Sequence, residues 1–71
     1  MSLYEGKENE SYTISDISTE DKEFRAFLFS LGCYPGENIT IVSRKKHSMV
    51  VAVKDGKYNI DNDIAKLIGV A

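Results

Sequence analysis

The chain has 71 residues, of which 42% are hydrophobic and 28% are charged, and its formal net charge is −2 at pH 7. This length suits one small domain, and the hydrophobic content is too high for a disordered chain. The acidic balance gives no overall positive field for nucleic acid, and no stretch reaches the roughly 18 apolar residues of a membrane helix, so we expect neither nucleic-acid binding nor membrane insertion.

The first part of the chain predicts a strand followed by a helix. Residues 1–10 are polar and are expected to be partly frayed, whereas residues 11–17 have the composition of a strand. A helix is predicted from about residue 19 to residue 31, with Ser18 or Thr19 as its cap. Its apolar side chains recur at i, i+3, i+4 and i+7, which forms one stripe of Phe24, Phe27, Leu28 and Leu31.

Glycine and proline mark the end of this helix and the turn after it. Gly32 follows the last residue of the stripe, where a left-handed C-cap is least costly for a residue without a Cβ. Pro35 and Gly36 fit the central positions of a type II turn, because proline fixes one φ and glycine supplies a positive one. Strands are then predicted over residues 37–43 and 49–54, joined by a polar connection.

A hairpin is predicted around Asp55-Gly56. This dipeptide is typical of a type I′ turn, which needs positive φ at both central positions. A two-residue loop there places Val53 opposite Tyr58 and Val51 opposite Ile60, so that apolar side chains meet on one face of the hairpin.

The last residues predict a helical turn and a closing strand. Asp61 can cap a turn through Ile64 and Ala65, and the strand follows within residues 67–70. The total is five short strands in a chain too short for a sandwich. We therefore expect a mainly β fold, a small SH3-like barrel of about five strands with one α-helix inserted between strands 1 and 2. We expect residues 1–71 to form a single domain of this kind.

Two segments resemble the ferrous iron transport protein A (FeoA) family. The family core L-x-x-L-G-hydrophobic-x-P-G resembles Leu28-Phe29-Ser30-Leu31-Gly32-Cys33-Tyr34-Pro35-Gly36, which precedes Ile39-Thr40-Ile41-Val42. The family ending A-x-x-I-x-V is similar to Ala65 through Val70. The resemblance covers about residues 12–70. It implies an SH3-like barrel, a small cytoplasmic protein, and an association with the membrane GTPase that imports ferrous iron in bacteria.

The chain departs from the family pattern at two places. Many members have glycine before the first strand where this chain has Asn9, and asparagine is the next-best residue for a left-handed position, so we expect the turn to be kept. Members often carry a Gly-Asp-Pro-like segment before the third strand, whereas this chain has Lys46-His47-Ser48. This second departure concerns the connection and any partner surface built on it.

Cys33 and His47 are the candidate metal ligands. A thiolate at Cys33 could ligate soft metal, but we favour a small buried hydrophobe, since the family pattern has an apolar residue there. His47 could also ligate metal, although the neighbouring Arg44, Lys45 and Lys46 oppose a cation. One cysteine and one histidine make no zinc signature, so we expect no required cofactor and at most weak Fe²⁺ binding.

Two surfaces are candidates for binding a protein partner. Phe29 lies off the predicted apolar stripe, which predicts a partly exposed aromatic near Arg25; the alternative is that it covers one edge of the barrel. The basic run Arg44-Lys45-Lys46 lies at a predicted hairpin tip in an acidic protein. It could dock on an acidic protein surface or on lipid headgroups, although such a run is more commonly a solvated tip that protects a strand end.

The sequence offers no catalytic constellation, so we expect a binding module and not an enzyme. A single histidine on a loop completes no Ser-His-Asp or Cys-His arrangement. With the resemblance, this predicts a cytoplasmic accessory protein of bacterial ferrous iron uptake that binds the FeoB-type membrane GTPase; one unpaired cysteine suits that compartment.

Two other functions remain open, as does the oligomeric state. The first is a transition-metal-binding or metal-sensing module that uses carboxylates with His47 or Cys33, although turns and caps already explain the aspartates. The second is a peptide-binding module of the eukaryotic SH3 kind. It needs a groove of exposed aromatics, which a chain with no tryptophan and few spare tyrosines disfavours.

Overall fold

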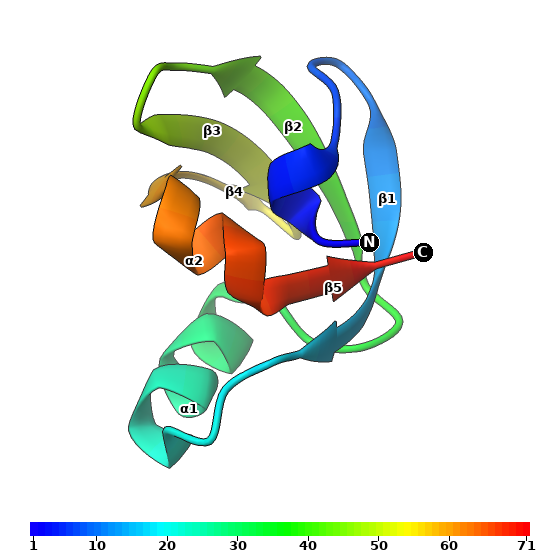
Figure 1. The fold of residues 1–71 in the computed structure, drawn as a ribbon. Helices are drawn as coiled ribbons and strands as arrows, with labels where there is room; N and C mark the ends of the chain where they lie inside the picture. Colours follow the sequence, from blue (N-terminus) through cyan, green and yellow to red (C-terminus); the bar gives the residue numbers. More distant parts are fainter.

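The computed structural model describes residues 1–71 as one curved, antiparallel sheet with short helices around it (Figure 1). The strands are β1 (Ser11–Ile17), β2 (Asn38–Arg44), β3 (Ser48–Val53), β4 (Gly56–Asp61) and β5 (Ile68–Val70), in the order β4-β3-β2-β1-β5. Helix α1 (Lys22–Leu31) follows β1, and helix α2 (Asn62–Leu67) connects β4 to β5. The expected mainly β fold with a helix between strands 1 and 2 is confirmed. The barrel is not closed, because the edge strands β4 and β5 do not pair with each other.

The first residues pack on the sheet, so the predicted fraying is wrong. Ser2 forms a β-bridge with Gly69, and the Val70 N–H donates to the Met1 carbonyl at 2.8 Å. A short 3-10 helix over Leu3–Glu5 follows, and the Leu3 side chain is fully buried in the core. Leu3, the partly buried Tyr4 and these backbone contacts therefore hold the segment, which lies along the outer edge of β5.

Helix α1 begins later than predicted. Its cap is Asp21, whose carboxylate accepts the N–H groups of Glu23 and Phe24, and the predicted Ser18 or Thr19 cap is wrong. The Thr19 hydroxyl instead accepts the Asp21 N–H at 3.2 Å, which stabilises the turn before the helix. The end is as predicted. Gly32 is left-handed with φ of 102°, and the next N–H reaches back to the Leu28 carbonyl.

The apolar stripe of α1 is buried only in part. The helix projects past one end of the sheet (Figure 1), and Leu28 is its single fully buried residue. Phe24 and Leu31 are half-buried, whereas Phe27 is 53% exposed. The spacing of the stripe correctly predicts a helix, but the helix lies beside the end of the sheet, where only part of the stripe is covered.

The turn after α1 is confirmed. Gly36 has φ of 93°, and the Glu37 N–H donates to the Tyr34 carbonyl at 3.1 Å, as a type II turn requires. Asn9 is also left-handed, with φ of 66°, so asparagine does keep the turn before β1.

The register predicted for the hairpin is wrong by two residues. Val53 pairs with Gly56 and Val51 pairs with Tyr58, so the two-residue loop is Lys54-Asp55 and no type I′ turn forms at Asp55-Gly56. A shift of two leaves the same side chains on each face. Gly56 has no positive φ, and a Cβ there would meet the outer end of the Tyr58 ring, so the glycine leaves room for the ring where it lies.

The core is a single cluster that draws on every strand. Its members share near-complete burial and are Leu3, Ile14, Ile17, Leu28, Cys33, Ile39, Ile41, Met49, Val51, Val53, Ile60, Ala65, Ile68 and Val70. No buried residue is polar or charged, so polar chemistry is confined to the surface.

Asp61 caps α2 as predicted, since its carboxylate accepts the Ile64 N–H at 2.9 Å.

Candidate binding surfaces

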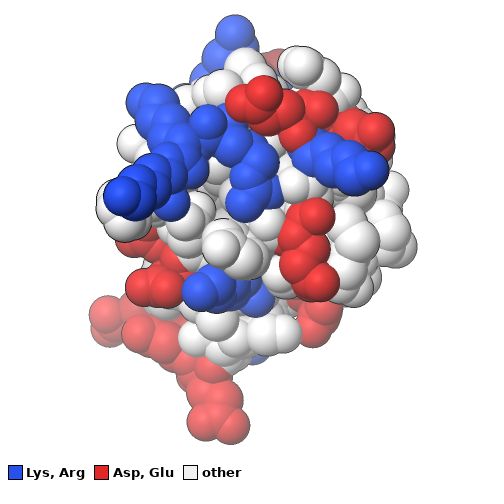
Figure 2. Space-filling view, turned by 45° about the horizontal axis from the view of Figure 1, so that its top comes forward, with Lys and Arg blue, Asp and Glu red and all other residues white.

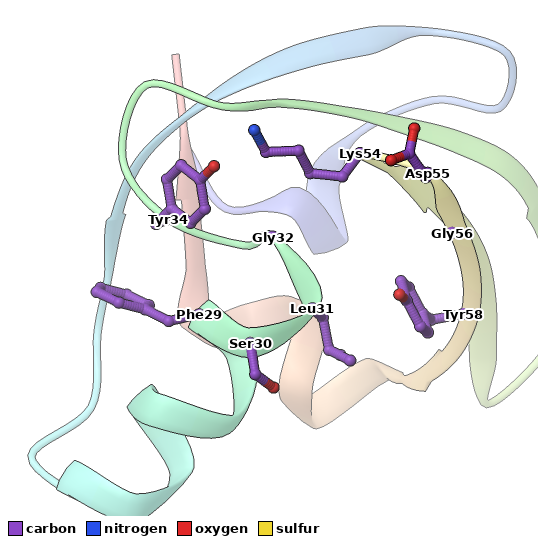
Figure 3. Close-up of a pocket in the computed structure, with 9 residues that line it drawn as sticks. All are labelled: Phe29, Ser30, Leu31, Gly32, Tyr34, Lys54, Asp55, Gly56 and Tyr58. Atoms are coloured by element: carbon purple, nitrogen blue, oxygen red, sulfur yellow. The ribbon is translucent and has the colours of Figure 1, made fainter.

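A hollow of about 390 Å³ lies between the C-terminal end of α1 and the β3–β4 turn (Figure 3). Leu31 and Tyr58 stand on opposite sides of it. Its other lining residues come from the same two regions and are Phe29, Ser30, Gly32, Tyr34, Lys54, Asp55 and Gly56. Three aromatic side chains line this open hollow, but most of its exposed surface is polar, so it combines aromatic rings with polar groups as many protein interfaces do.

Lys54 supplies the positive charge of this hollow, and its ammonium already interacts with neighbouring side chains. Its ammonium lies 3.1 Å from the Glu37 carboxylate and 5.3 Å from the centroid of the Tyr34 ring. Interaction with the Tyr34 side chain, and then with Glu37, raises the pKa of the Lys54 ammonium. Its aliphatic part lies against Gly32. Lys54 therefore joins the helix cap to the hairpin and is not a free cation.

The predicted aromatic of α1 lies at the surface. Phe29 is 41% exposed, and its ring meets Tyr34 edge-on with centroids 6.2 Å apart. Arg25 is exposed too, and its guanidinium donates to the Thr19 carbonyl before the helix. Sequence reasoning missed Phe27, because helical spacing assigned it to the buried stripe. A partner-binding role for Phe29 and Arg25 stays a prediction.

The basic run divides into one structural residue and two free ones. The Arg44 guanidinium donates to the carbonyls of Tyr4 at 2.7 Å and Gly6 at 2.6 Å, and it lies 5.3 Å from the Tyr4 ring centroid. Lys45 and Lys46 are exposed in the β2–β3 turn. Figure 2 shows several basic side chains close together at the upper left of the molecule, with acidic side chains at the lower left and also at the upper right. The tip remains a predicted docking surface through the two lysines.

Replacing Arg44 with alanine is expected to lower the free energy of unfolding by about 2 kcal/mol, because two charge-assisted hydrogen bonds to the N-terminal segment are lost. Lys45→Ala is the matched control and should change stability by less than about 0.5 kcal/mol, since Lys45 is exposed. Urea denaturation followed by circular dichroism measures both. Equal effects would show that Arg44 does not hold the N-terminal segment.

A second hollow, of about 380 Å³, surrounds the start of α2. It is lined by His47, Asp61, Asn62, Asp63 and Lys66. The Asn62 amide donates to the Lys46 carbonyl at 3.1 Å, while its buried carbonyl oxygen has no partner. Asp61 is occupied as the helix cap, and no group of three or more His, Cys, Asp or Glu side chains gathers closely enough to hold a metal ion.

Cys33 is a core residue and lies apart from His47. Its side chain belongs to the buried cluster, and burial raises the pKa of the Cys33 thiol. His47 is exposed at the β2–β3 turn. The structure therefore does not bring the two predicted ligands into one site.

Alkylation of Cys33 by iodoacetamide at pH 8 is expected to be at least about tenfold slower in the native protein than in guanidinium chloride. The raised pKa leaves less of the reactive thiolate, and burial excludes the reagent. Mass spectrometry of quenched time points gives both rates. Similar rates would mean that the thiol is accessible and open to metal.

The comparison with protein families decides the family. The model of the FeoA domain matches residues 1–71. The chain belongs to the FeoA domain family. The family is associated with ferrous iron transport, and the resemblance based on Leu28 to Gly36 is thereby confirmed. A search of the curated proteins found no match.

Solved structures share the fold of this FeoA domain. A crystal structure of an iron uptake regulatory protein (FeoA) has a TM-score of 0.87 at 20% identity over 99% of this chain and 93% of the other. Stenotrophomonas maltophilia FeoA, described as a prokaryotic SH3 domain protein in complex with zinc, has a TM-score of 0.88 at 20% identity over 100% and 89%. T. acidophilum IdeR has a TM-score of 0.86 at 30% identity, and this chain covers 33% of it. Neither α1 nor α2 has the length and apolar content of a membrane-spanning helix.

Proposed function

We propose that this FeoA domain is a non-catalytic, cytoplasmic accessory of bacterial ferrous iron uptake that binds the FeoB-type membrane GTPase. The observation that carries the proposal is the exposed aromatic surface of α1. Phe27 and Phe29 are both exposed on a helix whose one fully buried residue is Leu28. Aromatic side chains of this kind are enriched where proteins bind one another. Family membership and the description of S. maltophilia FeoA as a candidate activating factor of ferrous iron transport support the same partner.

The two exposed rings are held in place, which favours binding. Phe29 packs edge-on against Tyr34, and Phe27 lies 6.4 Å from the Phe24 ring. A ring that is already ordered loses little side-chain entropy when a partner covers it. The helix therefore presents a fixed apolar surface on both flanks of its anchor.

Titration with the cytoplasmic GTPase domain of the cognate transporter tests this proposal. Phe29→Ala is expected to weaken binding about tenfold, as the loss of an interface anchor would. Ala26→Ser is the matched control on the same helix and should bind as the unchanged chain does, because Ala26 is exposed and small. Absence of binding at tens of micromolar, in low salt and with nucleotide present, would refute the proposal. If Lys45→Glu with Lys46→Glu abolished binding while Phe29→Ala did not, the surface would be the basic tip.

A metal-binding or metal-sensing function is the second candidate. The observation behind it is that His47, Asp61 and Asp63 line one hollow at α2, although they do not gather closely enough to hold an ion in this arrangement and Asp61 is engaged as the helix cap. The zinc complex of S. maltophilia FeoA and the manganese-dependent repressors that share the fold are consistent with it. Titration with Fe²⁺ while recording amide NMR shifts tests it. Shifts confined to these three residues would support the function, and none at millimolar metal would refute it.

A further inference from the structure

The sheet has one edge that nothing in the chain covers. β4 pairs with β3 on one side only and is the last strand of the sheet. The opposite edge is protected, because Ser2 pairs with Gly69 of β5. Unpaired edge strands readily pair with another strand, and natural proteins commonly guard them with charged side chains.

The direction of the free backbone groups follows from the hairpin. In a two-residue hairpin the pair that closes the loop is hydrogen-bonded, which here is Val53 with Gly56. Alternation then directs the N–H groups of Lys57, Asn59 and Asp61 away from β3. The Asn62 N–H donates to the His47 carbonyl at 3.0 Å, which continues the same alternation beyond β4. The outward-facing N–H groups end at Asp61, because Asp61 is the N-cap of α2 and its carbonyl accepts the first hydrogen bond of that helix.

The side chains of these outward residues are free to meet a partner. Lys57, Asn59 and Asp61 are all exposed, and their spacing of two places them on one face of β4. Neither ion pair of the chain involves Lys57. The side chains along this edge are therefore positive at Lys57, neutral at Asn59 and negative at Asp61.

We propose that two copies of this chain pair through β4, antiparallel, about a two-fold axis at Asn59. In this register Asn59 lies opposite Asn59 of the second copy. Lys57 of each copy lies opposite Asp61 of the other, which gives two equivalent pairs of opposite charge. Opposite charges directly across two strands are favourable, and a two-fold axis requires a surface that complements itself. A register centred on Lys57 would place like charges opposite each other. The guarding charges thus exclude that register and favour the one centred on Asn59, which also uses every outward residue.

A disulfide trap tests the pairing. Facing residues of a hydrogen-bonded antiparallel pair have Cα atoms about 5.5 Å apart, which suits a disulfide. Asn59→Cys should therefore form a disulfide-linked dimer, at about 100 µM protein, at least about tenfold faster than Thr13→Cys. Thr13 is the matched control because it is exposed and lies on β1, which is paired on both sides. The native Cys33 is buried in both variants, and circular dichroism checks that both are folded.

The charges test the register. Adding Lys57→Glu to Asn59→Cys sets two acidic residues opposite each other and should slow the disulfide at least about threefold. Adding Asp61→Asn as well keeps a good helix cap but removes the repulsion, so it should restore part of the rate. Cross-linking of Asn59→Cys no faster than that of Thr13→Cys overturns the dimer. If Asn59→Cys cross-links fast and Lys57→Glu does not slow the reaction, the register about Asn59 is overturned.

Discussion

Replacing Leu28 with alanine is expected to lower the free energy of unfolding by about 3 kcal/mol, a large share of the stability of so small a domain. Leu28 is fully buried and is the one residue of α1 that enters the core cluster. Its removal leaves a cavity between the helix and the sheet. It also loosens α1, which then keeps only the contacts of the half-buried Phe24 and Leu31 with the core. Urea denaturation monitored by circular dichroism measures the change.

Phe27→Ala is the matched control for Leu28→Ala. Both residues belong to the stripe predicted from helical spacing, but Phe27 is 53% exposed. Its truncation removes little buried area and is expected to lower stability by less than about 1 kcal/mol. Equal losses for the two variants would contradict the placement of α1 at the end of the sheet.

The contrast between Leu28 and Phe27 shows what helical spacing determines. Spacing specifies that a helix forms and which side is apolar, because both follow from neighbours three and four residues apart. How much of that side is buried depends on the width of the surface beneath it. That width is set by strands distant in the sequence. The exposure of Phe29 was predictable because it lies outside the stripe; that of Phe27 was not.

Backbone chemistry was the most predictable part of the fold. Gly32, Gly36 and Asn9 all adopt positive φ as expected, because the penalty for other residues is local. Gly56 is the exception, since it has no positive φ and leaves room for the Tyr58 ring instead. A prediction from the dipeptide alone therefore assigned the wrong role to Gly56 and shifted the hairpin by two residues.

The surface residues were the least predictable. Arg44, Lys45 and Lys46 form one basic run in the sequence, but only Arg44 meets the carbonyls of the N-terminal segment. That contact joins residues about 40 positions apart. It also depends on Leu3 entering the core, which the polar stretch around Leu3 does not indicate. Long-range contacts of this kind decide which charges remain available to a partner.

Gly32→Ala is expected to lower the free energy of unfolding by about 2–3 kcal/mol for two separate reasons. Gly32 has φ of 102°, where any residue with a Cβ is strained. A Cβ there would also lie 2.5 Å from Cγ of Lys54, a side chain held by its ion pair with Glu37. The glycine is thus required by the cap of α1 and by its contact with the hairpin.

Gly36→Ala separates the two reasons. Gly36 has φ of 93°, but nothing lies within 4 Å of the position a Cβ would take. Its replacement should therefore lower stability by the backbone term alone, about 1 kcal/mol. Lys54→Gly should have a more favourable effect in the Gly32→Ala variant than in the unchanged chain, because only in the variant does the Lys54 side chain meet an added Cβ. In both chains it removes the ion pair with Glu37 and relieves the strain of a φ of 54° at Lys54. Equal losses for Gly32→Ala and Gly36→Ala, with no coupling to Lys54, would mean that the hairpin does not press on the helix cap.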